Sequence, residues 1–180
     1  LEVQPNDPTV RNKLGICYQQ LGNDAMARRE YDRALTLDPG LSEAHEVMGL
    51  VRMIYDFDWE GAEGSFKLAL QLSPNDADTH CHYGWLCWSV ERYDEAVDLV
   101  RRARELDPLA HRSDFSSALL RAGRYAEAAA AARETIAFDP GFARGHSALG
   151  WALLLQGDMA GGVAALERAL EASQDDPAFI

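Results

Sequence analysis

The sequence lacks any continuous run of 18 apolar residues, so no segment is long and apolar enough to cross a lipid bilayer as a helix. Basic residues are scarce as well. Among 180 residues, 17 lysines and arginines stand against 29 acids, and the formal net charge is −12. Because phosphate-binding surfaces need an excess of positive charge, we expect neither a nucleic acid nor a membrane as a partner.

Cysteine is almost absent too. The three cysteines, Cys17, Cys81 and Cys87, are odd in number and lack the spacing of a disulfide framework. We therefore expect reduced thiols and a cytoplasmic protein. The consecutive residues His80, Cys81 and His82 suggest a metal site at first sight, but neighbouring helical residues point about 100° apart. Three such side chains cannot bind one ion on a regular helix, so the sequence predicts no metal and no cofactor.

Catalytic motifs are missing. Gly61 with Gly64, and Gly161 with Gly162, lack the strand–turn–helix context that a phosphate-binding loop requires. No serine stands in a nucleophile-elbow sequence, and acids such as Asp94 lie where helices are expected to begin, a place that suits the helix dipole. We predict that the chain is not an enzyme.

What the sequence has instead is an internal repeat with a period of about 34 residues. Three small residues and a closing proline recur at equivalent places. The first set is Gly15, Gly49, Gly84, Ser116 and Gly150, the second is Ala27, Ala62, Ala96, Ala128 and Gly162, the third is Ala34, Ala69, Ala103, Thr135 and Ala169, and the prolines are Pro39, Pro74, Pro108 and Pro140. A fixed period of this length indicates stacked helical hairpins, which present a surface to partners.

The pattern resembles the tetratricopeptide repeat (TPR) family over nearly the whole chain. In the first copy the matching residues are Leu14, Gly15, Tyr18, Ala27, Tyr31, Ala34 and Pro39, while Arg11 stands where the family usually has tryptophan. The resemblance implies an all-α fold, a right-handed superhelical solenoid of about five helix-turn-helix repeats. The expected repeats are 8–41, 42–76 with a one-residue insertion, 77–108 with two residues fewer, 109–142 and 143–176.

The expected helix pairs follow from this register. They are 8–21 with 24–37, 42–55 with 59–72, 77–90 with 93–106, 109–122 with 125–138, and 143–156 with 159–172. The small residues should let paired helices approach closely, and the prolines should end each second helix. Gly22, Gly123 and Gly157 share the position where a left-handed backbone ends the first helix.

Three of the five histidines, His45, His80 and His146, also share one repeat position. The family usually has a packing tryptophan there, so we expect these rings to pack between helices. The additional residue of the second repeat is expected in the turn near 55–58.

The two ends suggest that the parent protein continues. Residues 1–7 resemble the tail of a preceding repeat, and residues 177–180 are a C-terminal remnant. In the last predicted helix, Val163, Leu166 and Leu170 would expose part of an apolar face, so an alternative is that this end pairs with a second copy.

In the TPR family the first helix of each repeat lines a concave groove, and the resemblance implies an apolar groove here. The predicted partner-binding residues are Leu50, Met53, Ile54, Trp85, Trp88, Leu120, Arg121, Trp151 and Leu154. Large aromatic side chains in desolvated pockets dominate binding energies, so Trp85, Trp88 and Trp151 are the expected anchors for a peptide or a partner helix. The alternative for each tryptophan is packing against neighbouring helices.

One ligand class of the family is a poor match. Members that bind the acidic C-terminal tails of heat-shock chaperones use lysine, arginine and asparagine at set groove positions. The corresponding residues here are Asn12, Ile16, Val47, Asp78 and His82. Asp78 would repel a carboxylate, so we do not expect an adaptor for such tails.

The main functional hypothesis is a non-catalytic scaffold for protein–protein interaction. A second comes from the segment 55–59 with Ala62 and 106–108, which resembles bacterial TPR segments attached to signalling modules such as winged-helix regulators. The chain would then be the sensory or regulatory part of a larger bacterial signalling protein. A third hypothesis is a self-association module that forms homodimers through its open ends.

Overall fold

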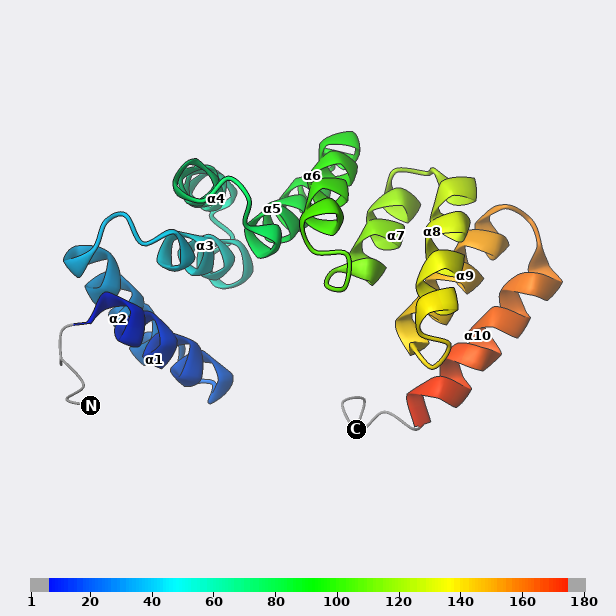
Figure 1. The fold of residues 1–180 in the computed structure, drawn as a ribbon, viewed down its shortest axis with the longest axis horizontal. Helices are drawn as coiled ribbons and strands as arrows, with labels where there is room; N and C mark the ends of the chain where they lie inside the picture. Colours follow the sequence, from blue (N-terminus) through cyan, green and yellow to red (C-terminus); the bar gives the residue numbers. More distant parts are fainter. Residues whose placement is uncertain (1–6, 175–180) are drawn as a thin grey trace. The chain divides into compact units, whose positions relative to one another are not determined.

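The computed structural model describes residues 7–174, and within them the secondary structure is helical throughout (Figure 1). The helices are α1 (Pro8–Gln20), α2 (Asp24–Leu37), α3 (Ser42–Val51), α4 (Trp59–Leu72), α5 (Ala77–Ser89), α6 (Tyr93–Leu106), α7 (Arg112–Arg121), α8 (Tyr125–Phe138), α9 (Ala143–Leu155) and α10 (Met159–Gln174), with a π-helical turn η1 (Arg52–Asp56) after α3. No helix in this part of the chain is both long and apolar enough to cross a membrane.

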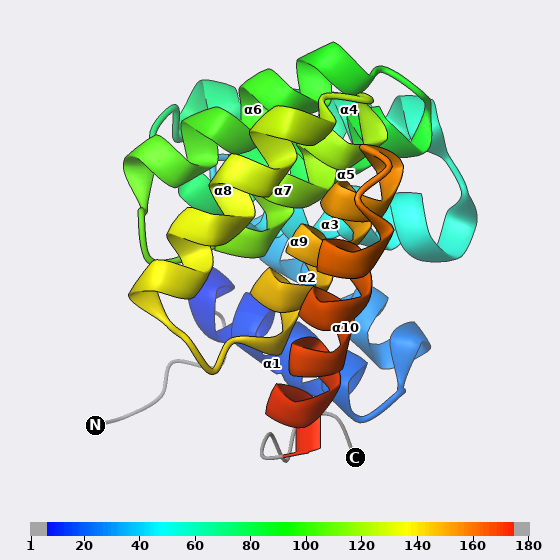
Figure 2. The ribbon, with the colours of Figure 1, turned by 90° about the vertical axis from the view of Figure 1, so that its right-hand side faces the viewer.

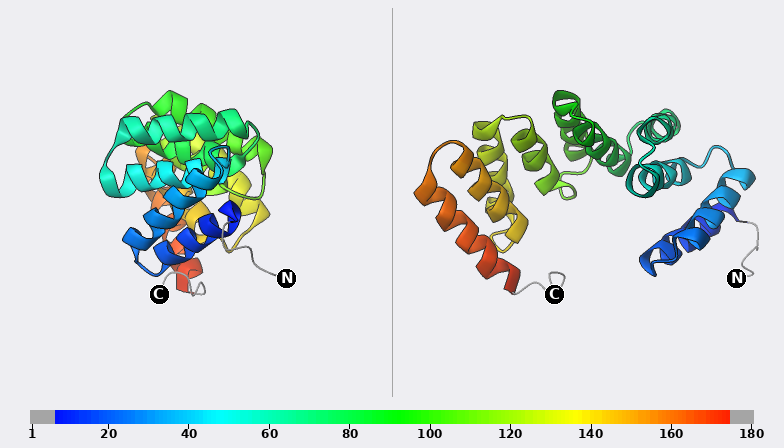
Figure 3. Two further views of the ribbon diagram at one scale, coloured as in Figure 1. Left: turned by 90° about the vertical axis from the view of Figure 1, so that its left-hand side faces the viewer. Right: turned by 180° about the vertical axis from the view of Figure 1, so that it is seen from behind.

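The chain divides into two compact units, residues 1–86 and 87–180. In the first unit α1 packs beside α2 and α3 beside α4 (Figure 3). In the second, α8, α9 and α10 lie side by side (Figure 2). Each pair is an antiparallel hairpin, as the repeat pattern predicts.

The small residues allow close packing within a hairpin, although the neighbour is most often a side chain rather than the opposing backbone. The ring of Tyr31 lies over Gly15, and a Cβ added to Gly49 would meet Phe66 Cε1 at 2.7 Å. Near Gly150 the backbone itself comes close, since a Cβ there would lie 3.0 Å from the carbonyl oxygen of Gly162. Close packing is thus confirmed, while the expected backbone contact is replaced in two hairpins by a buried aromatic ring.

The hairpin turns use a left-handed residue at one equivalent place. Gly22, Gly123 and Gly157 have φ values of 70°, 72° and 91°, as expected. Phe57 and Glu91 occupy the same position in the other two hairpins, with φ values of 53° and 62°. Four of the second helices, α2, α4, α6 and α8, end two residues before a proline, which confirms the predicted stops.

The start of α7 differs from the prediction, because the helix begins at Arg112 rather than at 109. The Asp107 carboxylate accepts hydrogen bonds from the backbone N–H groups of Leu109, at 2.9 Å, and Ala110, at 3.1 Å. These bonds hold the pKa of Asp107 below its ordinary value. His111 then adopts a left-handed conformation with a φ of 51°. The aspartate therefore folds this segment into a turn that competes with the first turn of a helix.

The additional residue of the second repeat is absorbed earlier than expected, in the π-helical turn η1. The Arg52 guanidinium fixes this turn to α4, because its Nη1 donates to the carbonyl oxygen of Gly61 at 3.0 Å and to Ser65 Oγ at 2.7 Å. On the other side, Arg28 of α2 donates to both carboxylate oxygens of Asp56, at 2.9 and 2.7 Å. A single inserted residue is accommodated in this way without breaking the helix.

The three equivalent histidines form polar links between consecutive repeats. Each imidazole bonds through Nε2 to the carbonyl oxygen of the proline six residues earlier: His45 to Pro39 at 2.8 Å, His80 to Pro74 at 3.0 Å, and His146 to Pro140 at 2.8 Å. The histidine thus ties the connecting turn to the first helix that follows it. Of the three cysteines, Cys17 is exposed on α1, whereas Cys81 and Cys87 are buried.

Candidate functional site

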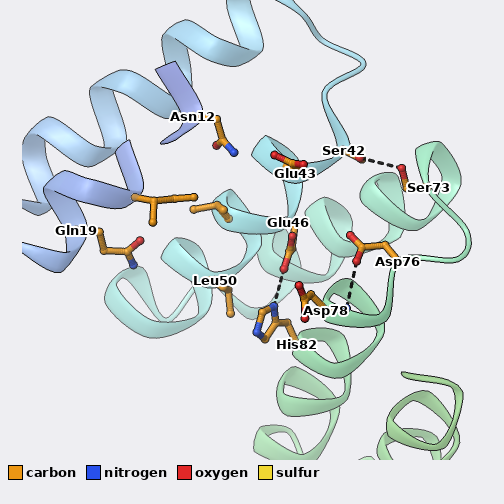
Figure 4. Close-up of a pocket in the computed structure, with 12 residues that line it drawn as sticks. Asn12, Gln19, Ser42, Glu43, Glu46, Leu50, Ser73, Asp76, Asp78 and His82 are labelled. Carbon is orange, nitrogen blue, oxygen red and sulfur yellow. Dashed lines mark hydrogen bonds and ion pairs between the residues drawn. The ribbon is translucent and has the colours of Figure 1, made fainter. Parts of the chain in front are cut away.

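Within the first unit, side chains from α1, α3 and α5 surround a pocket of about 580 Å³ (Figure 4). Residues on one face of each helix supply most of its walls, because side chains three or four positions apart project in the same direction. The lining residues are Asn12, Ile16, Gln19, Ser42, Glu43, Glu46, Val47, Leu50, Ser73, Asp76, Asp78 and His82.

Asn12 is the unusual residue of this pocket. It comes from α1 and its exposed fraction is 0%. Neither its Nδ2 nor its Oδ1 has a hydrogen-bond partner among residues 7–174. Buried amide groups in folded proteins are almost always paired, so an unpaired donor and acceptor at a pocket wall indicate a place for an incoming polar group.

The pocket carries a strong negative charge. Four of its lining residues are acids, Glu43, Glu46, Asp76 and Asp78, and none is lysine or arginine. Glu46 is only 9% exposed, and its Oε1 lies 2.7 Å from Nδ1 of His82. Burial of a carboxylate is costly unless hydrogen bonds or a cation offset it, and His82 meets part of that need.

The remaining acids differ in their surroundings. Asp76 precedes α5 and accepts hydrogen bonds from the Asp78 backbone at 3.1 Å and from Thr79 Oγ1 at 2.8 Å, so it is engaged at the start of that helix. Glu43 is exposed in the first turn of α3, one helical turn before Glu46. Two like charges at this spacing repel each other, which favours binding of a cation between them.

Four of the predicted partner-binding residues belong to the first unit. Leu50 lines the pocket, and Ile54 is 48% exposed on η1. Met53 is only 7% exposed, so its side chain is committed to internal packing. Trp85 is partly buried, and its ring meets the imidazole of His82 edge-on, with centroids 4.6 Å apart.

The other five predicted residues belong to the second unit. Trp88 and Leu120 pack against a core cluster that includes Val97 and Val100, and the Arg121 guanidinium lies 5.0 Å from the centre of the Trp88 ring. Trp151 is 53% exposed on α9. Leu154 faces Gly162 of α10, where an added Cβ would overlap its side chain. Of these five, Trp151 and Arg121 present the most open surface.

The predicted partner-binding residues are mostly apolar, and of these nine Leu50 lines the polar pocket. Asn12, Asp78 and His82, which stand at groove positions of the family, line it as well. The signal available was their spacing: Asn12 with Ile16, and Asp78 with His82, are four residues apart and must share a helix face. What the sequence does not reveal is that the Asn12 amide has no partner among the residues that the structure describes.

Two models of the tetratricopeptide repeat family match the chain, one at residues 8–41 and one at 113–177. Among curated proteins, PilF of Pseudomonas aeruginosa, a type IV pilus assembly protein, is 27% identical over 93 residues, covering 52% of this chain and 36% of that protein. The transcriptional regulator HilA of Salmonella typhimurium is 30% identical over 119 residues, covering 60% and 21%. The Hsp70-Hsp90 organizing protein of Triticum aestivum is 38% identical over 89 residues, covering 48% and 15%. The chain thus spans about a third or less of these relatives.

Solved structures share the fold. PilW, described as a type IV pilus biogenesis factor, superimposes with a TM-score of 0.84 at 21% identity, covering 95% of this chain and 80% of that one. YrrB, described as a TPR protein with an unusual peptide-binding site, gives a TM-score of 0.71 at 22% identity, covering 94% and 88%. These likenesses confirm the predicted fold class, an all-α helical repeat solenoid. With its repeat signature, its helical hairpins and its matches to two models of one family, the chain belongs to the tetratricopeptide repeat family.

Proposed function

We propose that this chain is a protein-interaction scaffold that binds a segment of a partner protein in the pocket between α1, α3 and α5. The observation that carries the proposal is the Asn12 side chain, which is fully buried at the pocket and has no hydrogen-bond partner for its Nδ2 or Oδ1 within residues 7–174. An extended peptide offers what this amide lacks, since each peptide group has one N–H donor and one carbonyl acceptor. The chain's scaffold role is non-catalytic in this proposal.

The comparisons support the general class of function. The TPR family consists generally of modules for protein interaction, YrrB is described as having a peptide-binding site, and the wheat relative is named as an organizing protein for two others. Leu50 lines the pocket and the Trp85 ring contacts His82, which also lines it, so we assign Leu50 and Trp85 as apolar contacts for the bound segment. In the second unit, Trp151 and Arg121 are the proposed contacts for a further part of the partner.

The test is selection of short phage-displayed peptides on the immobilised protein, followed by binding of the selected peptides to Asn12→Leu. Leucine has a similar size and no polar atoms, so the variant should lose peptide binding while its unfolding midpoint stays equal or rises, because an unsatisfied buried amide has been removed. Gln20→Leu is the matched control, since it lies exposed on the same helix outside the pocket.

The binding results of the two variants decide for or against the proposal. Loss of binding in Asn12→Leu but not in Gln20→Leu supports the proposal. Enriched peptides that bind Asn12→Leu as tightly as the original protein, or no enrichment of any peptide, would overturn it. Circular dichroism of each variant establishes that the helices are intact.

A second candidate function is a regulatory domain within a larger bacterial signalling protein. The observation that favours it is the similarity to HilA, which is named as a transcriptional regulator. The sequence on either side of these residues in the gene tests this directly. A DNA-binding or other signalling module there supports the candidate, and a chain made only of further repeats contradicts it.

A third candidate is self-association through α10, with a second copy of this chain as the occupant of its outer face. Met159, Val163 and Leu170 are 62%, 50% and 63% exposed, whereas Leu166 is partly covered by its contact with Gly150. Sedimentation velocity over a range of concentrations tests this candidate. We expect association that Leu170→Glu abolishes, and a monomer at every concentration would contradict it.

A further inference from the structure

We infer that the pocket between α1, α3 and α5 selects a basic side chain of its partner, with arginine preferred. This inference rests on the proposed function, because it specifies which peptides the pocket accepts. It depends on the placement of the acids, on the apolar wall beside them and on the Asn12 amide, which has no partner in the described part of the chain.

The acids come from two helices and face one space. Glu43 and Glu46 stand on α3, and Asp78 stands on α5 (Figure 4). Among the described residues that line the pocket, none is lysine or arginine. A cation that enters between the two helices therefore relieves the repulsion between Glu43 and Glu46 and compensates the buried charge of Glu46.

The apolar wall suits the stem of a long basic side chain. Ile16 of α1 and Val47 and Leu50 of α3 line the pocket next to the acids. Lysine and arginine bury their methylene groups along such surfaces while the charged end reaches polar groups. A free metal ion or a small cation would gain nothing from these three side chains, so the lining points to a basic side chain on a peptide.

Arginine fits this arrangement better than lysine. Its planar guanidinium presents five N–H donors, so one group can contact carboxylates from two helices at once, whereas an ammonium acts as a point charge. The Asn12 amide provides polar contacts at the same pocket for the adjoining peptide group. The same charges disfavour acidic ligands, in agreement with the expectation that Asp78 repels a carboxylate.

The experiment uses the peptides selected on the original protein. Each is synthesised again with one arginine replaced in turn by citrulline, which keeps the shape and removes the charge, or by lysine. Affinity is measured by fluorescence anisotropy against the original protein and against Glu43→Gln and Glu46→Gln. Glu60→Gln is the control variant, since it changes a carboxylate on α4 that does not line the pocket.

We expect arginine in the selected peptides and a loss of roughly tenfold or more in affinity on replacement by citrulline. Each glutamine variant at Glu43 or Glu46 should weaken binding of the arginine peptide, and the two changes together should cost less than the sum of their separate effects, because they remove the same contact. Glu60→Gln should bind as the original does.

Peptides that require Asn12 but contain no basic residue, or that bind Glu43→Gln and Glu46→Gln without loss, would overturn this inference and leave the proposed function standing. Peptides that require lysine and reject arginine would overturn the preference for a guanidinium. Failure to select any peptide would overturn both proposals together. Because Glu43 is exposed, its variant tests the charge even where Glu46→Gln disturbs the contact with His82.

Discussion

Gly49 in α3 and Gly64 in α4 are both helical glycines, but their surroundings differ. A Cβ at Gly49 would overlap the ring of Phe66, whereas no atom lies within 4 Å of the corresponding point at Gly64. We expect Gly49→Ala to lower the free energy of unfolding by roughly 1–3 kcal/mol through overpacking. Gly64→Ala should raise it by roughly 0.5–1 kcal/mol, because alanine has the higher helix propensity. Urea denaturation measures both, and equal effects of the two substitutions would contradict the packing account.

Tyr31 provides a test of burial at the same scale. Its side chain is 0% exposed, its hydroxyl donates to Gln19 Oε1 at 2.9 Å, and burial raises its pKa to about 12 from an ordinary 10.0. The pKa of Tyr31 is higher in the folded chain than in the unfolded one, so folding disfavours ionisation of its hydroxyl. The contribution of the neutral Tyr31 side chain to the free energy of unfolding is therefore complete below pH 10 and declines as the pH rises toward 12.

The expected result for Tyr31→Phe follows from the raised pKa of the Tyr31 hydroxyl in the folded chain. The difference in unfolding free energy between the original protein and Tyr31→Phe should be constant below pH 10 and should then shift in favour of phenylalanine, which cannot ionise. Chemical denaturation across the alkaline range measures this difference. A difference that does not change with pH would show that the Tyr31 hydroxyl ionises as easily in the folded chain as in the unfolded one.

At the scale of helices, the sequence predicted an element correctly wherever the repeated small residues and the closing proline indicate the same helix. In the first four hairpins the second helix carries small residues on its packing face and a proline just after its end, and these helices, α2, α4, α6 and α8, have the predicted bounds. The start of α7 was wrong because the Asp107 side chain captures two backbone N–H groups that a helix would otherwise use. That competition depends on a side-chain conformation, which periodicity does not reveal.

The π-helical turn η1 shows a related limit. Counting residues locates one insertion in the second repeat, but a longer turn and a π-helical turn accommodate it equally well in sequence terms. The contacts of Arg52 with Gly61 and Ser65 indicate which solution the chain adopts.

These contacts lead to a prediction at the same scale. Arg52→Met should lower the free energy of unfolding by roughly 1–3 kcal/mol, because it removes two charge-assisted hydrogen bonds between η1 and α4. Arg29→Met is the matched control, since Arg29 is exposed on α2 and has no polar side-chain partner within residues 7–174. Thermal unfolding followed by circular dichroism measures both variants. Similar midpoints for the two would mean that Arg52 does not stabilise the turn.

For the molecule as a whole, the repeat period was sufficient to predict the class of fold, while the candidate site needed coordinates. The prediction placed partner binding on apolar and aromatic residues such as Trp85 and Trp151. The resemblance to the family gives Asn12 a groove position, and the structure adds that this residue lines a pocket without a hydrogen-bond partner in the described part of the chain. Whether a polar side chain has a partner depends on atoms from other helices, and no spacing rule supplies that information.

The structure shows where part of the molecule's negative charge is concentrated. The net charge of −12 argued only against phosphate ligands. The pocket concentrates four acids beside an apolar wall, and this arrangement favours a partner segment of the opposite charge.

The most direct test of the central claim, that a partner segment binds at Asn12, is a nuclear magnetic resonance titration of the ¹⁵N-labelled protein with a selected peptide. The side-chain amide signals of Asn12 report on its Nδ2 hydrogens, which have no partner within residues 7–174. We expect these signals to shift progressively until the peptide saturates the protein, together with the backbone signals of α3 and the first turns of α5. Saturating peptide that leaves the Asn12 signals unchanged, with shifts confined to other helices, would contradict the account.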